Sequence, residues 1–118
     1  MATDDEILSV LADEYSRKIL SILGKNEMNA QQISDSLGIP TSTTYRKIKS
    51  LEELELVKKT KVVRTLEGLD ESYYQSMISG IDVKFKDGEV HCKLEKVAMD
   101  RKIQRLWEKF SDKSSLIP

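Results

Sequence analysis

The residues whose types and spacing could do chemistry lie in one short segment, residues 41–49, with the sequence TSTTYRKIK. Hydroxyl side chains stand at its start and cations follow them. Hydroxyl groups exchange hydrogen bonds with base edges, and cations bind guanine or phosphate. This composition is typical of a helix that enters the major groove of DNA. Five residues are predicted to contact bases: Thr41, Ser42, Thr43, Tyr45 and Arg46.

Cations continue beyond this segment. Residues 43–65 hold seven lysines and arginines against three glutamates, although the whole chain has a formal net charge of -1. Salt screens charges beyond about 8 Å, so a local basic patch attracts phosphate despite distant acids. Because neighbouring strand residues point to opposite faces, two or three of the cations after Val57 are expected to reach phosphate. The predicted phosphate contacts are Lys47, Lys49, Lys58, Lys59, Lys61 and Arg64.

Helical spacing predicts the elements that position these side chains. Thr3 and Glu6 form a capping box ahead of a first apolar stripe. Asp13 is a second cap candidate, and Gly24 a predicted helix stop. The pattern leaves open whether residues 4–24 form one helix or two.

Two more helices are predicted around a Gly38-Ile39-Pro40 turn. Asn29 can cap the first, and Gly38 can end it in the left-handed conformation. Thr41 or Ser42 can cap the second helix. Its buried stripe is predicted to be Thr44, Ile48, Leu51 and Leu54, which leaves Ser42, Thr43, Tyr45, Arg46 and Lys49 facing outward.

The hydrophobic period changes after Val57. The segment KKTKVVRT predicts a strand, a loop follows around Gly68, and SYYQSMI and IDVKFK are further strand candidates. Asp87-Gly88 is a hairpin signal that leads into EVHCKLE. Residues 97–111 return to helical spacing. The expected fold class is therefore α+β: a helical first half, a β-hairpin, a second β-hairpin and a C-terminal helix.

The segment PTSTTYRKIKSLEELELV resembles the recognition helix of winged helix-turn-helix transcription regulators, especially the ArsR-like group common in archaea. LADEYSRKILSIL resembles the preceding helix, AQQISDSLGIP the first helix and turn of the motif, and LVKKTKVVRT the first strand of the wing. The resemblance implies a dimer on a pseudo-palindromic operator. The chain as a whole is predicted to divide into a DNA-binding domain at residues 1–95 and a dimerisation helix and tail at residues 96–118.

Two features depart from the family pattern. Glu55 stands where the family usually has glycine, so a non-glycine residue must adopt the left-handed conformation or the helix must end differently. The wing tip has Glu67, Asp70 and Glu71, which would repel phosphate unless they point away from DNA.

The C-terminal segment has a second apolar stripe, flanked by charged residues as in a two-helix interface. It is expected to form the dimer contact, although packing onto its own chain is the alternative. The predicted interface residues are Met99, Ile103, Leu106, Trp107 and Phe110.

Several function classes find no support in the sequence. His91 and Cys92 are adjacent in a strand and therefore diverge, so no nucleophile, base or metal cluster is evident, and the five glycines form no phosphate loop. The chain is expected to be a non-enzyme without metal or cofactor. No apolar run approaches the roughly 20 residues that span a bilayer. The acidic N-terminus and single cysteine favour a cytoplasmic location.

The sequence therefore predicts a homodimeric, sequence-specific transcription regulator that binds double-stranded DNA through residues 42–54. The alternative is a winged-helix protein-interaction module of a transcription or chromatin assembly without sequence-specific DNA binding. No small-molecule effector is indicated.

Overall fold

The structure, a computed structural model, describes residues 2–97. Its elements are α1 (Asp4–Ala12), α2 (Glu14–Lys25), β1 (Met28–Asn29), α3 (Ala30–Leu37), α4 (Thr41–Glu53), β2 (Val57–Arg64), β3 (Asp70–Ser76), β4 (Ile78–Lys86) and β5 (Glu89–Lys96). The expected α+β class and the order of elements through the second hairpin are confirmed.

The two N-terminal helices are separate. Thr3 caps α1 in the predicted capping box with Glu6. Asp13 has an extended backbone, which ends α1, and its side chain accepts the Ser16 N–H at the start of α2. The predicted stop at Gly24 is wrong by one residue. The helix continues through Lys25, and Asn26 ends it by donating its N–H to the carbonyl of Ile22.

The turn between α3 and α4 forms as predicted. Asn29 caps α3 in a capping box with Gln32, and Gly38 ends it with a φ of 66°. The predicted cap of α4 is wrong, because Thr41 is already helical and Pro40 occupies the cap position without a side-chain hydrogen bond. Proline presets the φ that a helix start needs.

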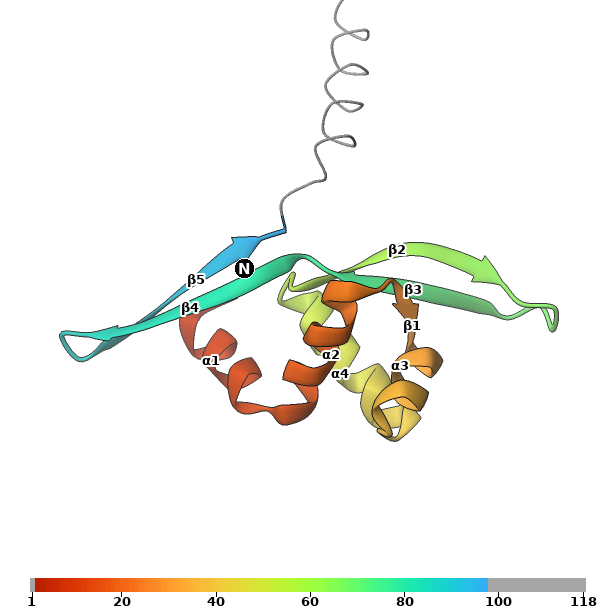
Figure 1. Ribbon diagram of the computed structural model, residues 1–118, viewed down its shortest axis with the longest axis horizontal. Coiled ribbons are helices and arrows are strands. Elements are labelled where there is room, and N and C mark those ends of the chain that lie inside the picture. Colours follow the sequence, from red (N-terminus) through yellow and green to blue (C-terminus); the bar gives the residue numbers. More distant parts are fainter. Residues whose placement is uncertain (1, 98–118) are drawn as a thin grey trace, which may run out of the picture.

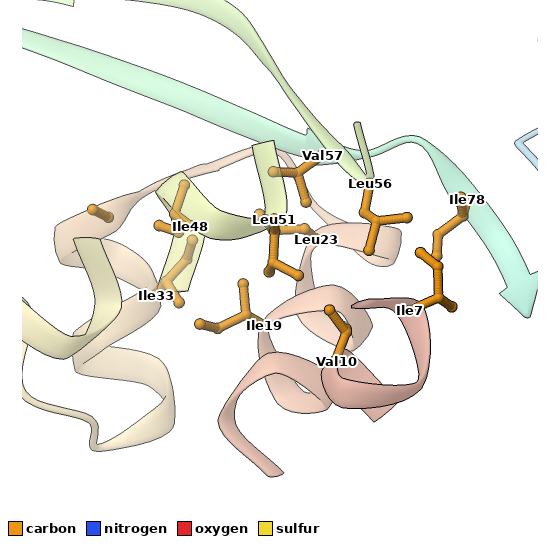
Figure 2. Close-up of a cluster of buried hydrophobic side chains, with 11 residues drawn as sticks. Ile7, Val10, Ile19, Leu23, Ile33, Ile48, Leu51, Leu56, Val57 and Ile78 are labelled. Atoms are coloured by element: carbon orange, nitrogen blue, oxygen red, sulfur yellow. The ribbon is translucent and has the colours of Figure 1, made fainter. Parts of the chain in front are cut away.

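The core lies between the helices and the root of the sheets (Figure 2). Ile19 and Leu23 of α2 meet Ile33 of α3 and Ile48 of α4, and all four side chains are almost fully buried. Residues of α1 and the strand roots close the cluster: Ile7, Val10, Leu51, Leu56, Val57 and Ile78. The predicted stripe of α4 faces this core, with Thr44, Ile48 and Leu51 buried and Leu54 half-buried.

Two hairpins extend in opposite directions above the helices (Figure 1). β2 and β3 pair antiparallel, and the short β1 adds to the other edge of β3. β4 and β5 form a separate antiparallel pair, and their turn is Asp87-Gly88 with φ values of 54° and 78°. Positive φ at both positions is the geometry that this dipeptide signal predicts.

Glu55 adopts the left-handed conformation with a φ of 62°. Its N–H donates to the Glu52 carbonyl, and the Leu56 N–H donates to the Leu51 carbonyl at 2.9 Å. These two bonds form a Schellman motif, in which glycine is the usual residue at the position of Glu55. The helix thus ends in a Schellman motif at a glutamate, a residue that the left-handed conformation disfavours.

Glu55→Gly is expected to raise the free energy of unfolding by about 0.5–1 kcal/mol. The left-handed conformation costs an L-residue about 1–2 kcal/mol, and the greater chain entropy of glycine offsets part of that gain. Urea unfolding followed by circular dichroism measures the change. Glu53→Gly, inside the last helical turn, should destabilise instead. Destabilisation by Glu55→Gly would contradict the strain assigned to Glu55.

Candidate nucleic-acid interface

One face of α4 presents polar side chains to solvent. Ser42, Tyr45, Arg46 and Lys49 are all exposed and stand at i, i+3, i+4 and i+7, which places them in one stripe. The side chain of Tyr45 is 55% exposed. In the described residues 2–97, Arg46 makes no salt bridge. These four side chains form the α4 outer face.

Thr41 and Thr43, also predicted to contact bases, are half-buried. The Thr41 hydroxyl lies 3.3 Å from the Ser34 hydroxyl of α3, and Ser34 in turn donates to the carbonyl of Ile39. Thr41 therefore helps to hold α3 against the start of α4. Of the five residues predicted to contact bases, Ser42, Tyr45 and Arg46 are therefore the ones that are exposed.

The first turn of α4 is open to a ligand. No side chain caps it in the described structure, and the first backbone N–H with an intrahelical partner is that of Thr44, which donates to the Pro40 carbonyl at 3.0 Å. Free N–H groups at a helix start bind phosphate oxygens and align with the positive end of the helix dipole. The start of α4 and its outer face can thus contact phosphate and base edges together.

Lys47 points away from the outer face and is engaged within the fold. Its ammonium lies 3.0 Å from a carboxylate oxygen of Asp13, and its side chain is only 28% exposed. The same Asp13 oxygen accepts the N–H of Ser16 at 2.9 Å and its hydroxyl at 2.6 Å. The hydrogen bond from the Ser16 hydroxyl, with a smaller effect of Lys47, lowers the pKa of Asp13 against the opposing effect of burial. Asp13 therefore joins the start of α2 to α4, and the Lys47 ammonium is paired with it within the fold.

Asp13→Ala is expected to lower the free energy of unfolding by about 1 kcal/mol at pH 7, because it removes the cap of α2. Asp13→Asn is the matched control, since asparagine caps equally well but has no charge for Lys47. A carboxyl whose pKa is lowered by folding stabilises above its unfolded pKa and loses this contribution as pH falls. The stability gap between wild type and Asp13→Asn should therefore close below about pH 4. Urea unfolding across this range measures it, and a gap that widens at acid pH would contradict the pairing.

The cations of the wing, the β2–β3 hairpin, divide into two groups. Lys58 and Lys59 are exposed at its base and have no salt bridge among residues 2–97. Lys61 lies 3.4 Å from Glu27 and 4.7 Å from the centre of the Tyr73 ring. Arg64 lies 3.6 Å from Asp70, with both side chains exposed. The unpaired phosphate candidates of the wing are therefore Lys58 and Lys59.

A bulge changes which of these cations share a face. Lys59 lies opposite Tyr74 and Lys61 opposite Tyr73, with a register shift between them. Opposed residues point to the same face, and neighbours in a strand point to opposite faces. Lys59 and Lys61 are thus on opposite faces, whereas the regular alternation predicted for this strand would place them together.

Two of the three acids near the wing tip bind polar side chains of the same chain. Glu71 accepts a hydrogen bond from the Asn29 amide at 2.9 Å and so connects the wing to the cap of α3. Asp70 pairs with Arg64, while Glu67 is exposed in the loop. Tyr45 of α4 and the residues Asp70, Glu71 and Ser72 of β3 line one hollow, so the α4 outer face and the wing form a continuous surface.

His91 and Cys92 diverge as predicted. His91 is exposed and lies 3.6 Å from Glu89, whereas the thiol of Cys92 faces Asp4 of α1. Burial, followed by the charges of Asp4 and Asp5, raises the pKa of this thiol. Across residues 2–97, no group of three His, Cys, Asp or Glu side chains is placed to hold a metal ion. In the same part of the chain, no helix has the length and apolar character that crossing a membrane requires.

The residues predicted to form a dimer contact lie outside the described part of the chain. They are Met99, Ile103, Leu106, Trp107 and Phe110.

Comparison with known proteins agrees with this geometry. Residues 11–60 match a protein-family model described as a helix-turn-helix domain. These residues span α2, α3, α4 and the start of β2, and the β2–β3 wing follows directly. The chain folds as a winged helix-turn-helix.

A solved structure supports the same fold. The crystal structure of NolR from Sinorhizobium fredii matches 64% of this chain and 69% of its own, with a TM-score of 0.51 and 24% sequence identity. No curated protein sequence matches the chain. In this winged helix-turn-helix, α4 is the second helix of the motif.

Proposed function

We propose that this chain is a DNA-binding transcription regulator of the ArsR-like type, which places α4 in the major groove as a homodimer. The observation that carries the proposal is the division of α4 into two faces. Thr44, Ile48 and Leu51 are buried, while the four side chains of the outer face are exposed. The match of residues 11–60 to a helix-turn-helix domain supports it.

The side chains of the outer face suit different contacts. Arg46 can bind guanine through two parallel hydrogen bonds, and Ser42 and Tyr45 can exchange single bonds with base edges. Lys49 lies one helical turn further along and suits phosphate, as do Lys58 and Lys59 at the base of the wing. The free N–H groups at the start of α4 add a fourth phosphate contact. Base contacts would give sequence preference, and phosphate contacts would fix the register.

The homodimer gives the proposal its geometry. Two copies related by a twofold axis would present two α4 helices to successive major grooves about 34 Å apart. Such a dimer requires a pseudo-palindromic site. The apolar stripe of residues 99–110 supplies the contact between copies, so residues 1–95 act as the DNA-binding domain and residues 96–118 as the dimerisation segment.

A mobility-shift assay with random and genomic duplexes tests the proposal. At low salt, retardation is expected at micromolar protein or below, because non-specific binding is electrostatic. Lys49, Lys58 and Lys59 of each copy would neutralise about six phosphates per dimer and give log K a slope near -5 against log salt. An absence of retardation at micromolar protein would favour the alternative, a winged-helix module that binds proteins. The exposed Leu66 and Leu69 beside Glu67 at the wing tip are the feature that suits such a module.

A further inference from the structure

The β4–β5 hairpin is amphipathic along its whole length. One face is apolar and is formed by three opposed pairs: Ile81 with Leu94, Val83 with Cys92, and Phe85 with Val90. The other face has the pairs Asp82 with Lys93, Lys84 with His91, and Lys86 with Glu89. Such alternation is typical of a sheet with one face packed and the other in water. The apolar face is therefore suited to being covered from end to end.

The helices cover only part of this face. Cys92 of β5 donates its N–H to the carboxylate of Asp4 in α1 at 3.2 Å, and Cys92 and Leu94 pack against the core. On β4, Ile81 also packs against the core, but Val83 is 45% exposed and Phe85 is 72% exposed. A two-stranded hairpin is marginally stable unless its apolar face is packed. Exposed apolar side chains in a continuous row mark an interaction surface.

This uncovered row continues into a groove at the root of the hairpin. Leu11 of α1, Leu20 of α2 and Ile78 and Ile81 of β4 line a hollow of about 280 Å³. Ile81, Val83 and Phe85 alternate along β4 and so share one face. The uncovered row thus extends from Ile81 to Phe85, about 13 Å along the strand, and meets the hollow at Ile81.

We propose that this surface, the α1–β4 groove formed by Leu11, Leu20, Ile78, Ile81, Val83 and Phe85, binds residues 98–112 of a second copy of the chain. The inference rests on the proposed function for the existence of the dimer, and it identifies the surface that receives the apolar stripe. Met99, Ile103, Leu106 and Phe110 stand at helical spacing and would span about 17 Å as a helix. An apolar helical stripe in an apolar groove is a common mode of recognition.

The charges of the two partners are complementary. Asp4, Asp5 and Glu89 line a hollow between the start of α1 and the end of the hairpin, beside the groove. Residues 98–110 contain four lysines and arginines against two acids. The cations of this segment would therefore meet acids at the Glu89 end of the groove, while Arg17 lines its other end. Attraction at the acidic end favours association at low salt.

The last described residue, Val97, lies near the groove. The Val97 N–H donates to the Met77 carbonyl at 3.0 Å, which holds the start of the segment at the root of the hairpin, next to Ile78. Each copy then offers one groove and one stripe. Their reciprocal exchange closes a twofold dimer, as the two half-sites of a palindrome require.

Oligomeric state without DNA gives the first test. The wild-type chain is expected to be a dimer by analytical ultracentrifugation. Phe85→Glu should raise its dissociation constant by at least about a hundredfold, since it removes a buried aromatic side chain from each of the two grooves. Lys84→Glu, the adjacent residue on the charged face, is the matched control and should leave the constant within about threefold. Phe85 is exposed in the single chain, so its replacement should leave the circular dichroism spectrum unchanged. An unchanged dimer in Phe85→Glu overturns the proposal.

Cross-linking identifies the occupant. In a Cys92→Ser background, chains with Val83→Cys are mixed with chains with Leu106→Cys and treated with a short bismaleimide. These positions lie near the centres of groove and stripe, so the result does not depend on the direction of the helix. The proposal expects a covalent species of twice the chain mass, and none when Lys84→Cys replaces Val83→Cys. A chain that has both Val83→Cys and Leu106→Cys tests the intramolecular alternative. A cross-link that forms only within this chain, or no cross-link at all, overturns the proposal.

The two proposals fail differently. A Phe85→Glu chain that remains dimeric and still retards DNA overturns the groove assignment alone. A dimer that is lost in Phe85→Glu, together with DNA binding that is unchanged in Arg46→Ala, overturns the role of α4 and supports the groove.

Discussion

Arg46→Ala is expected to weaken binding to the preferred DNA site by about tenfold to a hundredfold per half-site. Arg46 is exposed on the α4 outer face and is free of salt bridges in residues 2–97, so its guanidinium is available to a base. A two-bond arginine–guanine contact contributes about 1–3 kcal/mol of discrimination. The loss should be larger on the preferred site than on random DNA, because a base contact provides sequence preference. Fluorescence anisotropy with both duplexes at fixed salt measures it.

Lys18→Ala is the control for charge alone. Lys18 is also exposed but lies on α2, where it pairs with Glu14 at 3.1 Å. Its replacement removes the same formal charge at a distance from the α4 outer face and should change affinity by less than about twofold. Equal effects of the two substitutions would show that net charge, and not a contact made by α4, governs binding.

Leu51→Ala is expected to lower the free energy of unfolding by about 2–5 kcal/mol. The side chain has 0% exposure and lies in the cluster that joins α4 to α2 and to the start of β2. A small domain has a stability of about 5–15 kcal/mol, so this single cavity removes a large share of it. Urea unfolding at 25 °C measures the change, and a shift in the midpoint without a change in slope would assign it to the folded state.

Ser50→Ala is the neighbouring control. Ser50 is exposed, and its hydroxyl donates to the carbonyl of Arg46 within the helix. Its replacement should change stability by less than about 0.5 kcal/mol. A loss below about 1 kcal/mol in Leu51→Ala would contradict the place of α4 in the core.

Local rules predicted much of the fold. The capping residues Thr3, Asp13 and Asn29 act as expected, because a cap depends on a side chain and a backbone group only three residues apart. The apolar period of α4 identified its buried face, and Asp87-Gly88 identified its hairpin. The sequence left open whether Glu55 is left-handed or the helix ends differently, and the structure has Glu55 in the left-handed conformation.

Long-range pairing could not be predicted from the sequence. Lys47 was expected to bind phosphate, but Asp13, 34 positions earlier in the chain, lies 3.0 Å from it. Lys61 and Arg64 likewise pair with Glu27 and Asp70. A cation's sequence neighbours give no information on such partners. The bulge after Lys59 is equally invisible, because it depends on register against β3.

The α1–β4 groove also depends on contacts between distant segments, which the sequence does not predict. The alternation of Ile81, Val83 and Phe85 predicts a strand with a covered face but not the element that covers it. Only the structure shows that α1 contacts β5 and that Val83 and Phe85 of β4 stay exposed. The extent of the uncovered surface therefore depends on tertiary packing.

Isolation and sequencing of the genomic DNA that the chain binds would test the central claim most directly. If α4 enters the major groove as part of a dimer, the recovered fragments should share a pseudo-palindrome whose half-sites lie about 10 base pairs apart, centre to centre. The same experiment with Arg46→Ala should lose enrichment of that sequence. Recovery of fragments without a common sequence, or of the same palindrome by Arg46→Ala at equal enrichment, would contradict the assignment of α4 as the element that reads DNA.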